Sequence, residues 1–255
     1  MRANKKNVNN FITLVGYMAS VFVWLLIWHI AATSINKEIF LPTPGRVFSV
    51  LWNDLLPSES FRTSIAASLA HIGAGFLLGG VSGIILAVLS AFSRIIRMFL
   101  WFPIKIMKSV PVASFVILTL LWMDSDDLSI FIPAIIVLPT LYINTLTGIE
   151  QTDGRLLEMA DLFKVSLLRR IVYIYVPQIL PYVLSASSLA IGMAWKSGIA
   201  AEIIGLAKNS IGNELYKAKI YLLTPELFAW TIVIVALSIL CEIIIKAVAR
   251  LIKRT

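Results

Sequence analysis

Charged residues are scarce in this 255-residue chain, at 14% of the sequence, whereas hydrophobic residues make up 59%. Soluble domains carry about 25% charged and about 45–50% apolar residues, so the composition excludes a water-soluble fold. The single cysteine excludes an intrachain disulfide. Mean hydropathy is +0.89, and the apolar residues form runs that approach the length of about 20 residues needed to cross a bilayer core. The membrane is therefore the expected solvent.

Residue patterns for catalysis and metal binding are also lacking. The two histidines, His29 and His71, lie in different apolar segments without the neighbouring ligands of a metal site. A G-x-x-x-x-G-K-[ST] phosphate loop is absent from the sequence, so any ATP and Mg²⁺ that drive the protein are expected on a partner chain. The basic residues lie between apolar blocks rather than on one solvated face, which argues against nucleic acid. We expect no catalytic residue, metal or cofactor in this chain.

Six apolar segments are predicted to be transmembrane helices, which makes the chain an all-α polytopic membrane protein. The first segment is longer than the apolar part of a signal peptide, about 7–15 residues, so we interpret it as a retained helix. Residues 1–255 are predicted to form a single transmembrane domain with a core of about 65–250. The predicted segments are residues 11–32, 67–92, 98–122, 129–149, 179–205 and 227–247.

Most of the 22 basic residues lie in alternate inter-helix regions and at the two ends. Basic residues flank transmembrane helices mainly on the cytoplasmic side, so these regions, including both termini, are predicted to be cytoplasmic. The regions are the N-terminal tail with Arg2, Lys5 and Lys6, the second loop and its flank with Arg94, Arg97, Lys105 and Lys108, the fourth loop with Arg155, Lys164, Arg169 and Arg170, and the C-terminal end with Lys246, Arg250, Lys253 and Arg254.

Small residues form a stripe in the second segment, where Gly75, Gly79 and Gly83 recur every four residues. Such a stripe lets another helix backbone approach closely, so helix packing is favoured over a binding role. Prolines interrupt the next two segments, which are predicted to be kinked or broken; they either line a pathway or are simply bent. These prolines are Pro103, Pro111, Pro133 and Pro139.

The fourth loop combines polar residues with an apolar helical pattern. Leu156, Leu157, Ala160 and Phe163 recur near helical spacing, which predicts a short amphipathic helix, and Ser166 is placed to cap the helix that follows. A cytoplasmic loop seldom needs an exposed apolar face. A partner protein that receives this face would explain it.

The same loop carries a more specific motif, Glu158-Met159-Ala160, which resembles the EAA coupling motif of type I ABC importer permeases. Further residues of the motif at matching distances are Ser166, Arg169-Arg170, Pro177 and Leu180-Pro181. Landmarks similar to the nitrate, sulfonate and taurine branch of that family are Leu41-Pro42-Thr43-Pro44, Gly75-Phe76, Gly83, Ser93-Arg94, Val110-Pro111, Ala194-Trp195 and Ala200-Ala201-Glu202.

The resemblance implies the fold of a type I importer permease in a bacterial inner membrane. It also implies a homodimer of permeases, cytoplasmic ABC ATPase subunits that bind ATP and Mg²⁺, and an extracytoplasmic solute-binding protein. The branch includes transporters of sulfonates, nitrate, bicarbonate and thiamine precursors. Within a coupling segment of about 150–170, the implied ATPase-coupling residues are Leu157, Glu158, Met159, Ala160, Phe163 and Lys164.

Two positions depart from the family pattern. Met159 replaces the middle alanine, and Lys164 replaces a glycine that follows the helix of the motif. Glycine supplies a left-handed backbone conformation at helix ends, an option that Lys164 is expected to lack.

Lys196 is the candidate for a transport pathway, because an ionisable residue within an apolar segment is costly and usually faces the interior of a helix bundle. It either attracts an anionic substrate or forms a structural ion pair, with Glu202 or with a neighbouring helix. Asn144, Trp195 and Ser197 are weaker candidates for the same pathway.

Two other classes of protein remain as alternatives. A secondary transporter or channel should show inverted repeats or carboxylate relays, and neither is present in the sequence. A membrane-embedded enzyme would need clustered His, Asp or Glu residues, but the cluster of Asp124, Asp126 and Asp127 lies in a short outer loop where solvation is expected. Glu242 and Lys246 are predicted to pair on one helix surface.

Overall fold

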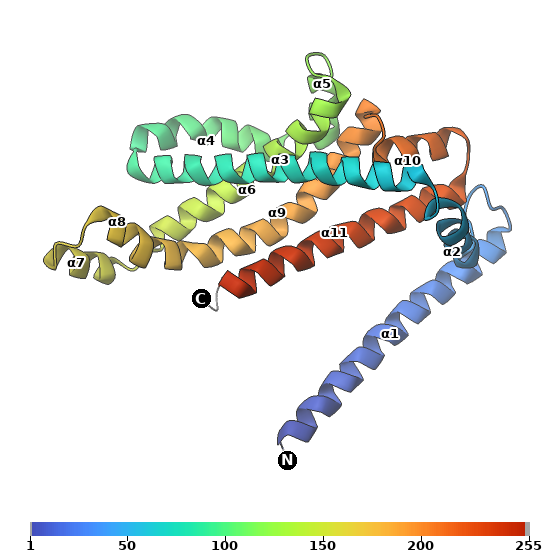
Figure 1. The fold of residues 1–255 in the computed structure, drawn as a ribbon, viewed down its shortest axis with the longest axis horizontal. Coiled ribbons are helices and arrows are strands. Elements are labelled where there is room, and N and C mark those ends of the chain that lie inside the picture. Colours follow the sequence, from blue (N-terminus) through green and yellow to red (C-terminus); the bar gives the residue numbers. More distant parts are fainter. Residues whose placement is uncertain (1, 253–255) are drawn as a thin grey trace. The chain divides into compact units, whose positions relative to one another are not determined.

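The computed structural model describes the backbone of residues 2–252 and the side chains of residues 15–251. The side chains of Arg2, Lys5 and Lys6 and the residues Lys253 and Arg254, on which part of the topology prediction rests, lie outside the described part. Helices account for the regular structure of the described residues, as predicted (Figure 1). They are α1 (Arg2–Ile35), α2 (Pro44–Val50), the π-helical η1 (Leu51–Leu55), α3 (Glu59–Phe92), α4 (Arg94–Ser109), α5 (Val112–Thr119), α6 (Ser125–Glu150), α7 (Gly154–Leu162), α8 (Leu167–Arg170), the π-helical η2 (Ile171–Tyr175), α9 (Val176–Gly205), α10 (Ile211–Ile220) and α11 (Thr224–Ile252).

Five stretches of helix are long and apolar enough to cross a membrane, and a sixth results if the bent pair α4 and α5 is one span. Each predicted segment overlaps one of these six, so the prediction of a polytopic helical membrane protein is confirmed. The five stretches are Val15–Ile35, Glu59–Phe92, Ser125–Glu150, Leu167–Gly205 and Thr224–Leu251.

The third predicted segment is broken, and the break lies at Pro111. Val110 has extended backbone angles of φ −75° and ψ 130°, and α5 leaves α4 at an angle of 105°. A residue that precedes proline is driven out of the helical region by the proline ring, which explains the position of the break. By contrast, α6 continues through Pro133 and Pro139, so of the predicted kink or break in the fourth segment, the break is not formed.

The chain forms two compact units, of which the smaller comprises Met1–Phe61 and Lys217–Ile232. After α1, the side-chain hydroxyl of Thr43 caps α2 by accepting a hydrogen bond from the amide of Arg46, and Pro44 occupies the first turn. The rings of Trp28 and Phe228 stack at 5.7 Å, which fastens α1 to the start of α11 within this unit.

The larger unit comprises Arg62–Tyr216 and Val233–Thr255 and contains the packed helices α3, α6 and α9. Gly75, Gly79 and Gly83 are buried on the face of α3 that meets α6. A Cβ atom at Gly79 would lie 2.8 Å from the Cα of Ala134, closer than real contacts allow. The missing side chains therefore let the two backbones approach.

The ends of α4 and α6 near α7 are joined by a salt bridge. Figure 1 shows α4 running back along α3, with α7 and α8 at the end of the unit where α3 ends. There Arg97 of α4 pairs with Glu150 of α6. On α11 the predicted pair of Glu242 and Lys246 is confirmed as a salt bridge four residues apart.

Candidate coupling segment and transport pathway

The predicted amphipathic helix of the fourth loop is α7. Its N-cap is Asp153, whose side chain accepts a hydrogen bond from the amide of Arg155 at 2.9 Å. The Asp153 amide in turn donates to the side-chain oxygen of Gln178 in α9, also at 2.9 Å. The start of α7 is thus bonded directly to a long helix of the unit.

Two different faces of α7 carry its apolar residues. Ala160 is 1% exposed and Leu157 is half-buried, so these side chains face the rest of the chain. Met159, Leu162 and Phe163 face outward, and the last two are 82% and 77% exposed. The expectation of one apolar face containing both Ala160 and Phe163 is therefore wrong, because Phe163 follows the last residue of α7 as its C-cap and is exposed, whereas Ala160 within the helix is buried.

Exposed Leu162 belongs to the outward face, although the motif did not mark it. Its spacing of three residues from Met159 is the signal that would have identified it, once the motif residues were placed on a helical projection. Glu158 is exposed beside this face. An exposed apolar surface of this kind on a polar loop is suited to receive a partner protein.

Arg170 fixes the end of α7. Its guanidinium group pairs with the carboxylate of Asp161 and donates hydrogen bonds to the carbonyl oxygens of Ala160 at 3.2 Å and Val165 at 2.8 Å. One side chain therefore holds the last turn of α7 and the chain that leaves it. Arg170 is also the last residue of α8, which leads directly into η2 and then α9.

Lys164 adopts the left-handed conformation that the sequence led us to exclude, with φ at 51°. The Lys164 amide donates to the carbonyl of Asp161 at 3.0 Å, and the Val165 amide donates to the carbonyl of Ala160 at 2.9 Å. These two bonds form a Schellman motif, the usual helix end in which glycine occupies the left-handed position. The bonds and the Arg170 contacts impose on lysine the backbone that the family glycine adopts readily.

Replacing Lys164 by glycine is expected to stabilise the permease. In the folded state, glycine avoids the cost of about 1–2 kcal/mol that a residue with a Cβ atom pays for the left-handed conformation. In the unfolded state, the greater backbone freedom of glycine removes about 0.4–1 kcal/mol of this gain in stability. A rise in the midpoint of thermal unfolding of about 1–4 °C is expected. The control is Lys105→Gly inside α4, where glycine should lower the unfolding midpoint. An unchanged midpoint for Lys164→Gly would show that the left-handed turn at Lys164 carries no strain.

Lys196 is exposed on α9, whereas its neighbours Trp195 and Ser197 are buried in the unit. The three residues therefore do not line one surface, because adjacent residues on a helix point about 100° apart. The expectation that Lys196 faces the interior of this chain's bundle is wrong. Lys196 forms no salt bridge with the described residues, and the proposed pair with Glu202 is not formed.

Exposed side chains run along α9 on the same side as Lys196. Ser185, Leu189 and Met193 precede it at intervals of four, four and three residues, which is one helical stripe. Next to this stripe, the Thr140 hydroxyl of α6 lies 3.9 Å from the sulfur of Met193. Half-buried Asn144 donates to the Thr140 carbonyl at 2.8 Å. Polar groups of α6 and the lysine of α9 thus border one apolar surface.

Glu202 is fully buried and joins three parts of the larger unit. One carboxylate oxygen accepts hydrogen bonds from the Ser68 hydroxyl of α3 at 2.8 Å and from the Gly212 amide at 3.0 Å. The Ser68 oxygen also accepts from the Ile211 amide at 2.9 Å. The carboxylate and the Ser68 hydroxyl together satisfy the first two amides of α10 and tie them to α3 and α9.

Replacing Glu202 by alanine is expected to lower stability. The substitution leaves the buried Ser68 hydroxyl and Gly212 amide without acceptors, at a cost of about 1–3 kcal/mol for each unsatisfied group. Glu202→Gln retains an acceptor oxygen and should lose less. Thermal unfolding of purified wild type, Glu202→Gln and Glu202→Ala should give midpoints that fall in that order. Equal midpoints would show that the Glu202 hydrogen bonds add nothing to stability.

The described residues contain no group of three or more His, Cys, Asp or Glu side chains arranged to hold a metal ion. Long apolar helices, a bent span and an exposed helix on a connecting loop together define a multi-pass membrane protein. Residues 79–255 match the family of binding-protein-dependent transport system inner membrane components, and the chain belongs to this family. It is a permease subunit of an ABC importer.

Relatives over most of the chain are transport permeases. The chain is 30% identical over 228 residues to the aliphatic sulfonates transport permease protein SsuC of Escherichia coli (strain K12), which covers 88% of this chain and 86% of SsuC. It is 26% identical over 212 residues to the nitrate import permease protein NrtB of Synechococcus elongatus, which covers 79% of this chain and 75% of NrtB.

A solved structure with the same fold is that of a bacterial alginate ABC transporter in complex with an alginate pentasaccharide-bound periplasmic protein. The TM-score is 0.62 at 17% identity, and the match covers 98% of both chains. At this identity the likeness establishes the fold alone. The permease fold predicted from the sequence is confirmed.

Proposed function

We propose that this permease moves a small anion through a pathway between two copies of the chain and that a separate ATPase drives the movement through α7. The outward apolar face of α7 is the observation that carries the coupling part of the proposal. A solute-binding protein delivers the solute on the outer side. ATP and Mg²⁺ belong to the ATPase, and the permease contributes no catalytic group.

The construction of the loop supports a coupling role for α7. Exposed Phe163 and Met159 supply apolar contact, and Glu158 supplies a charge for a basic partner residue. Buried Ala160 and half-buried Leu157 connect this surface to the chain, and Lys164 sets the turn. Since Arg170 and Asp153 fasten both ends of α7, movement of a docked ATPase would displace α7 together with α9.

Lys196 supports an anionic solute. An exposed ammonium group in a transmembrane helix is costly in lipid, so its face is expected to border water and a second permease copy. Asn144 contributes an amide beside this face, while Trp195 and Ser197 support the helix from behind. Relatives are named for nitrate, bicarbonate, taurine and aliphatic sulfonates, all of which carry a negatively charged oxygen group. We propose a small oxyanion or sulfonate as the solute.

The positive-inside distribution of basic residues supports a bacterial cytoplasmic membrane protein with both termini in the cytoplasm. The α7 loop then lies on the cytoplasmic side, where an ATPase is available. Residues 1–255 act as one permease domain in this proposal. A secondary transporter or channel would have no use for the α7 surface.

Lys196→Gln is expected to reduce solute uptake into proteoliposomes that contain permease, ATPase and binding protein. Loss of a charged contact costs about 1.5–3 kcal/mol, which corresponds to a drop of about ten- to a hundredfold. Labelled nitrate, bicarbonate, taurine and an alkanesulfonate serve as solutes. Lys196→Arg should retain uptake, and Lys208→Gln is the control at an exposed lysine outside the helix. Normal uptake by Lys196→Gln would overturn the role of Lys196.

A further inference from the structure

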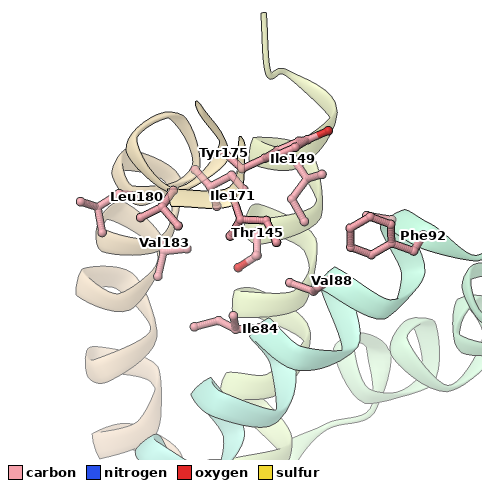
Figure 2. Close-up of a pocket in the computed structure, with 12 residues that line it drawn as sticks. Ile84, Val88, Phe92, Thr145, Ile149, Ile171, Tyr175, Leu180 and Val183 are labelled. Carbon is pink, nitrogen blue, oxygen red and sulfur yellow. The ribbon is translucent and has the colours of Figure 1, made fainter. Parts of the chain in front are cut away.

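An apolar cavity of about 360 Å³ lies between α3, α6, η2 and α9 at the end of the larger unit that carries α7. Figure 2 shows Ile84 and Val88 of α3, Ile149 of α6 and Val183 of α9 turned toward this space. Thr145 and Tyr175 are the lining residues with hydroxyl groups, and the buried hydroxyl of Thr145 has no hydrogen-bond partner in the described structure. The rest of the lining is apolar and offers few polar partners to an ordered water.

A second, polar hollow adjoins the cavity around the last turn of α3. It is lined by Ser90, Ala91, Arg94, Arg97 and Trp101 with the neighbouring Met98, and Ala91 borders both spaces. Arg97 is neutralised by its salt bridge with Glu150. Exposed Arg94 forms no salt bridge or hydrogen bond within the described residues, so its charge is available.

We propose that these two spaces bind one anionic phospholipid, with an acyl chain in the apolar cavity and the phosphate group at Arg94. The apolar lining, beside transmembrane helices, suits a hydrocarbon chain. A guanidinium group at the helix end suits a phosphate, since basic pockets between transmembrane helices recognise anionic lipid headgroups. Trp101 beside Arg94 has the amphipathic ring that favours the membrane interface.

The solute pathway is a poorer use of this cavity. A small anion would lose its hydration in a space whose lining carries only the hydroxyls of Thr145 and Tyr175, whereas an acyl chain has no hydration shell of this kind to lose. The cavity also touches Ile171 and Tyr175 of η2, the segment between the coupling loop and α9. A lipid in this position contacts the path by which α7 moves α9, so lipid composition would influence coupling.

Lipid retention tests the proposal on the full permease copurified with its ATPase. The complex is equilibrated with bicelles of phosphatidylcholine and phosphatidylglycerol in equal amounts, and native mass spectrometry measures the lipid that stays bound. The wild-type complex should retain more phosphatidylglycerol than phosphatidylcholine. Arg94→Gln should reduce this preference by about fivefold, the contribution of one basic residue at an anionic lipid surface. Lys108→Gln on the same helix is the charge control and should not change it.

The apolar cavity is tested separately by filling it. Val88→Phe should lower retention of both lipids, whereas Leu89→Phe, which places the same ring at the neighbouring position outside the cavity lining, should not. A photocrosslinking amino acid at position 88 should yield an adduct with the mass of a phospholipid. An adduct with the ATPase or with a second permease, or equal lipid retention by wild type and Arg94→Gln, would overturn the proposal.

Discussion

Phe163→Asp is expected to prevent recovery of the ATPase with the permease. Phe163 is 77% exposed at the end of α7, and it is the largest exposed apolar side chain of this loop. Loss of a central aromatic residue from a protein interface costs about 2–4 kcal/mol, and a buried carboxylate would add to that cost. Affinity should fall by about thirtyfold or more, as measured by stoichiometric copurification from gently solubilised membranes.

Matched variants separate loss of docking from loss of folding. Phe163→Leu keeps an apolar side chain and should retain most of the bound ATPase, while Leu162→Asp should act like Phe163→Asp because Leu162 shares the outward face. All three variants should elute as folded permease on size exclusion, since these side chains contribute little to the chain's own packing. Full recovery of the ATPase with Phe163→Asp would place the coupling contact elsewhere.

Gly79→Val is expected to prevent the permease from folding stably. Even the Cβ atom of the new residue would lie 2.8 Å from the Cα and 2.9 Å from the carbonyl carbon of Ala134. Neither helix has a flexible side chain at this point that could move away, so α3 and α6 must separate. Overpacking a core costs about 1–3 kcal/mol for small insertions, and displacement of two backbones should exceed that range.

The neighbouring glycine provides the control. A Cβ atom at Gly80 meets nothing within 4 Å, and alanine is favoured over glycine inside a helix by about 1 kcal/mol. Gly80→Ala should therefore keep or raise the unfolding midpoint, measured by fluorescence-detected size exclusion after heating. Similar midpoints for Gly79→Val and Gly80→Ala would contradict the close packing of α3 on α6.

The helices were predictable because apolar length and proline positions are local properties of the sequence. The break of the third segment falls at Pro111, which is preceded by Val110 in extended conformation. Pro133 and Pro139 are likewise prolines within a predicted helix, yet α6 continues through both of them. Both prolines are buried, and Pro133 lies against the glycine stripe of α3 at Gly75, so tertiary packing holds the helix together. Sequence alone does not reveal which prolines are supported in this way.

The candidate sites were predictable only in part. The motif located α7, but its division into inward Ala160 and outward Leu162 and Phe163 depends on how Arg170 folds the loop. Lys164 adopts a backbone that its residue type disfavours, because two Schellman bonds impose it. The face of Lys196 could not be inferred, since α9 is apolar on all sides and gives no amphipathic signal.

Transport by the reconstituted parts is the most direct measurement of the account's central claim. Proteoliposomes containing the permease and its copurified ATPase should accumulate solute only when ATP, Mg²⁺ and the binding protein are all present, and Phe163→Asp should abolish that uptake. Accumulation by the permease alone, without ATP, would contradict the claim. The chain would then work as a secondary transporter or a channel.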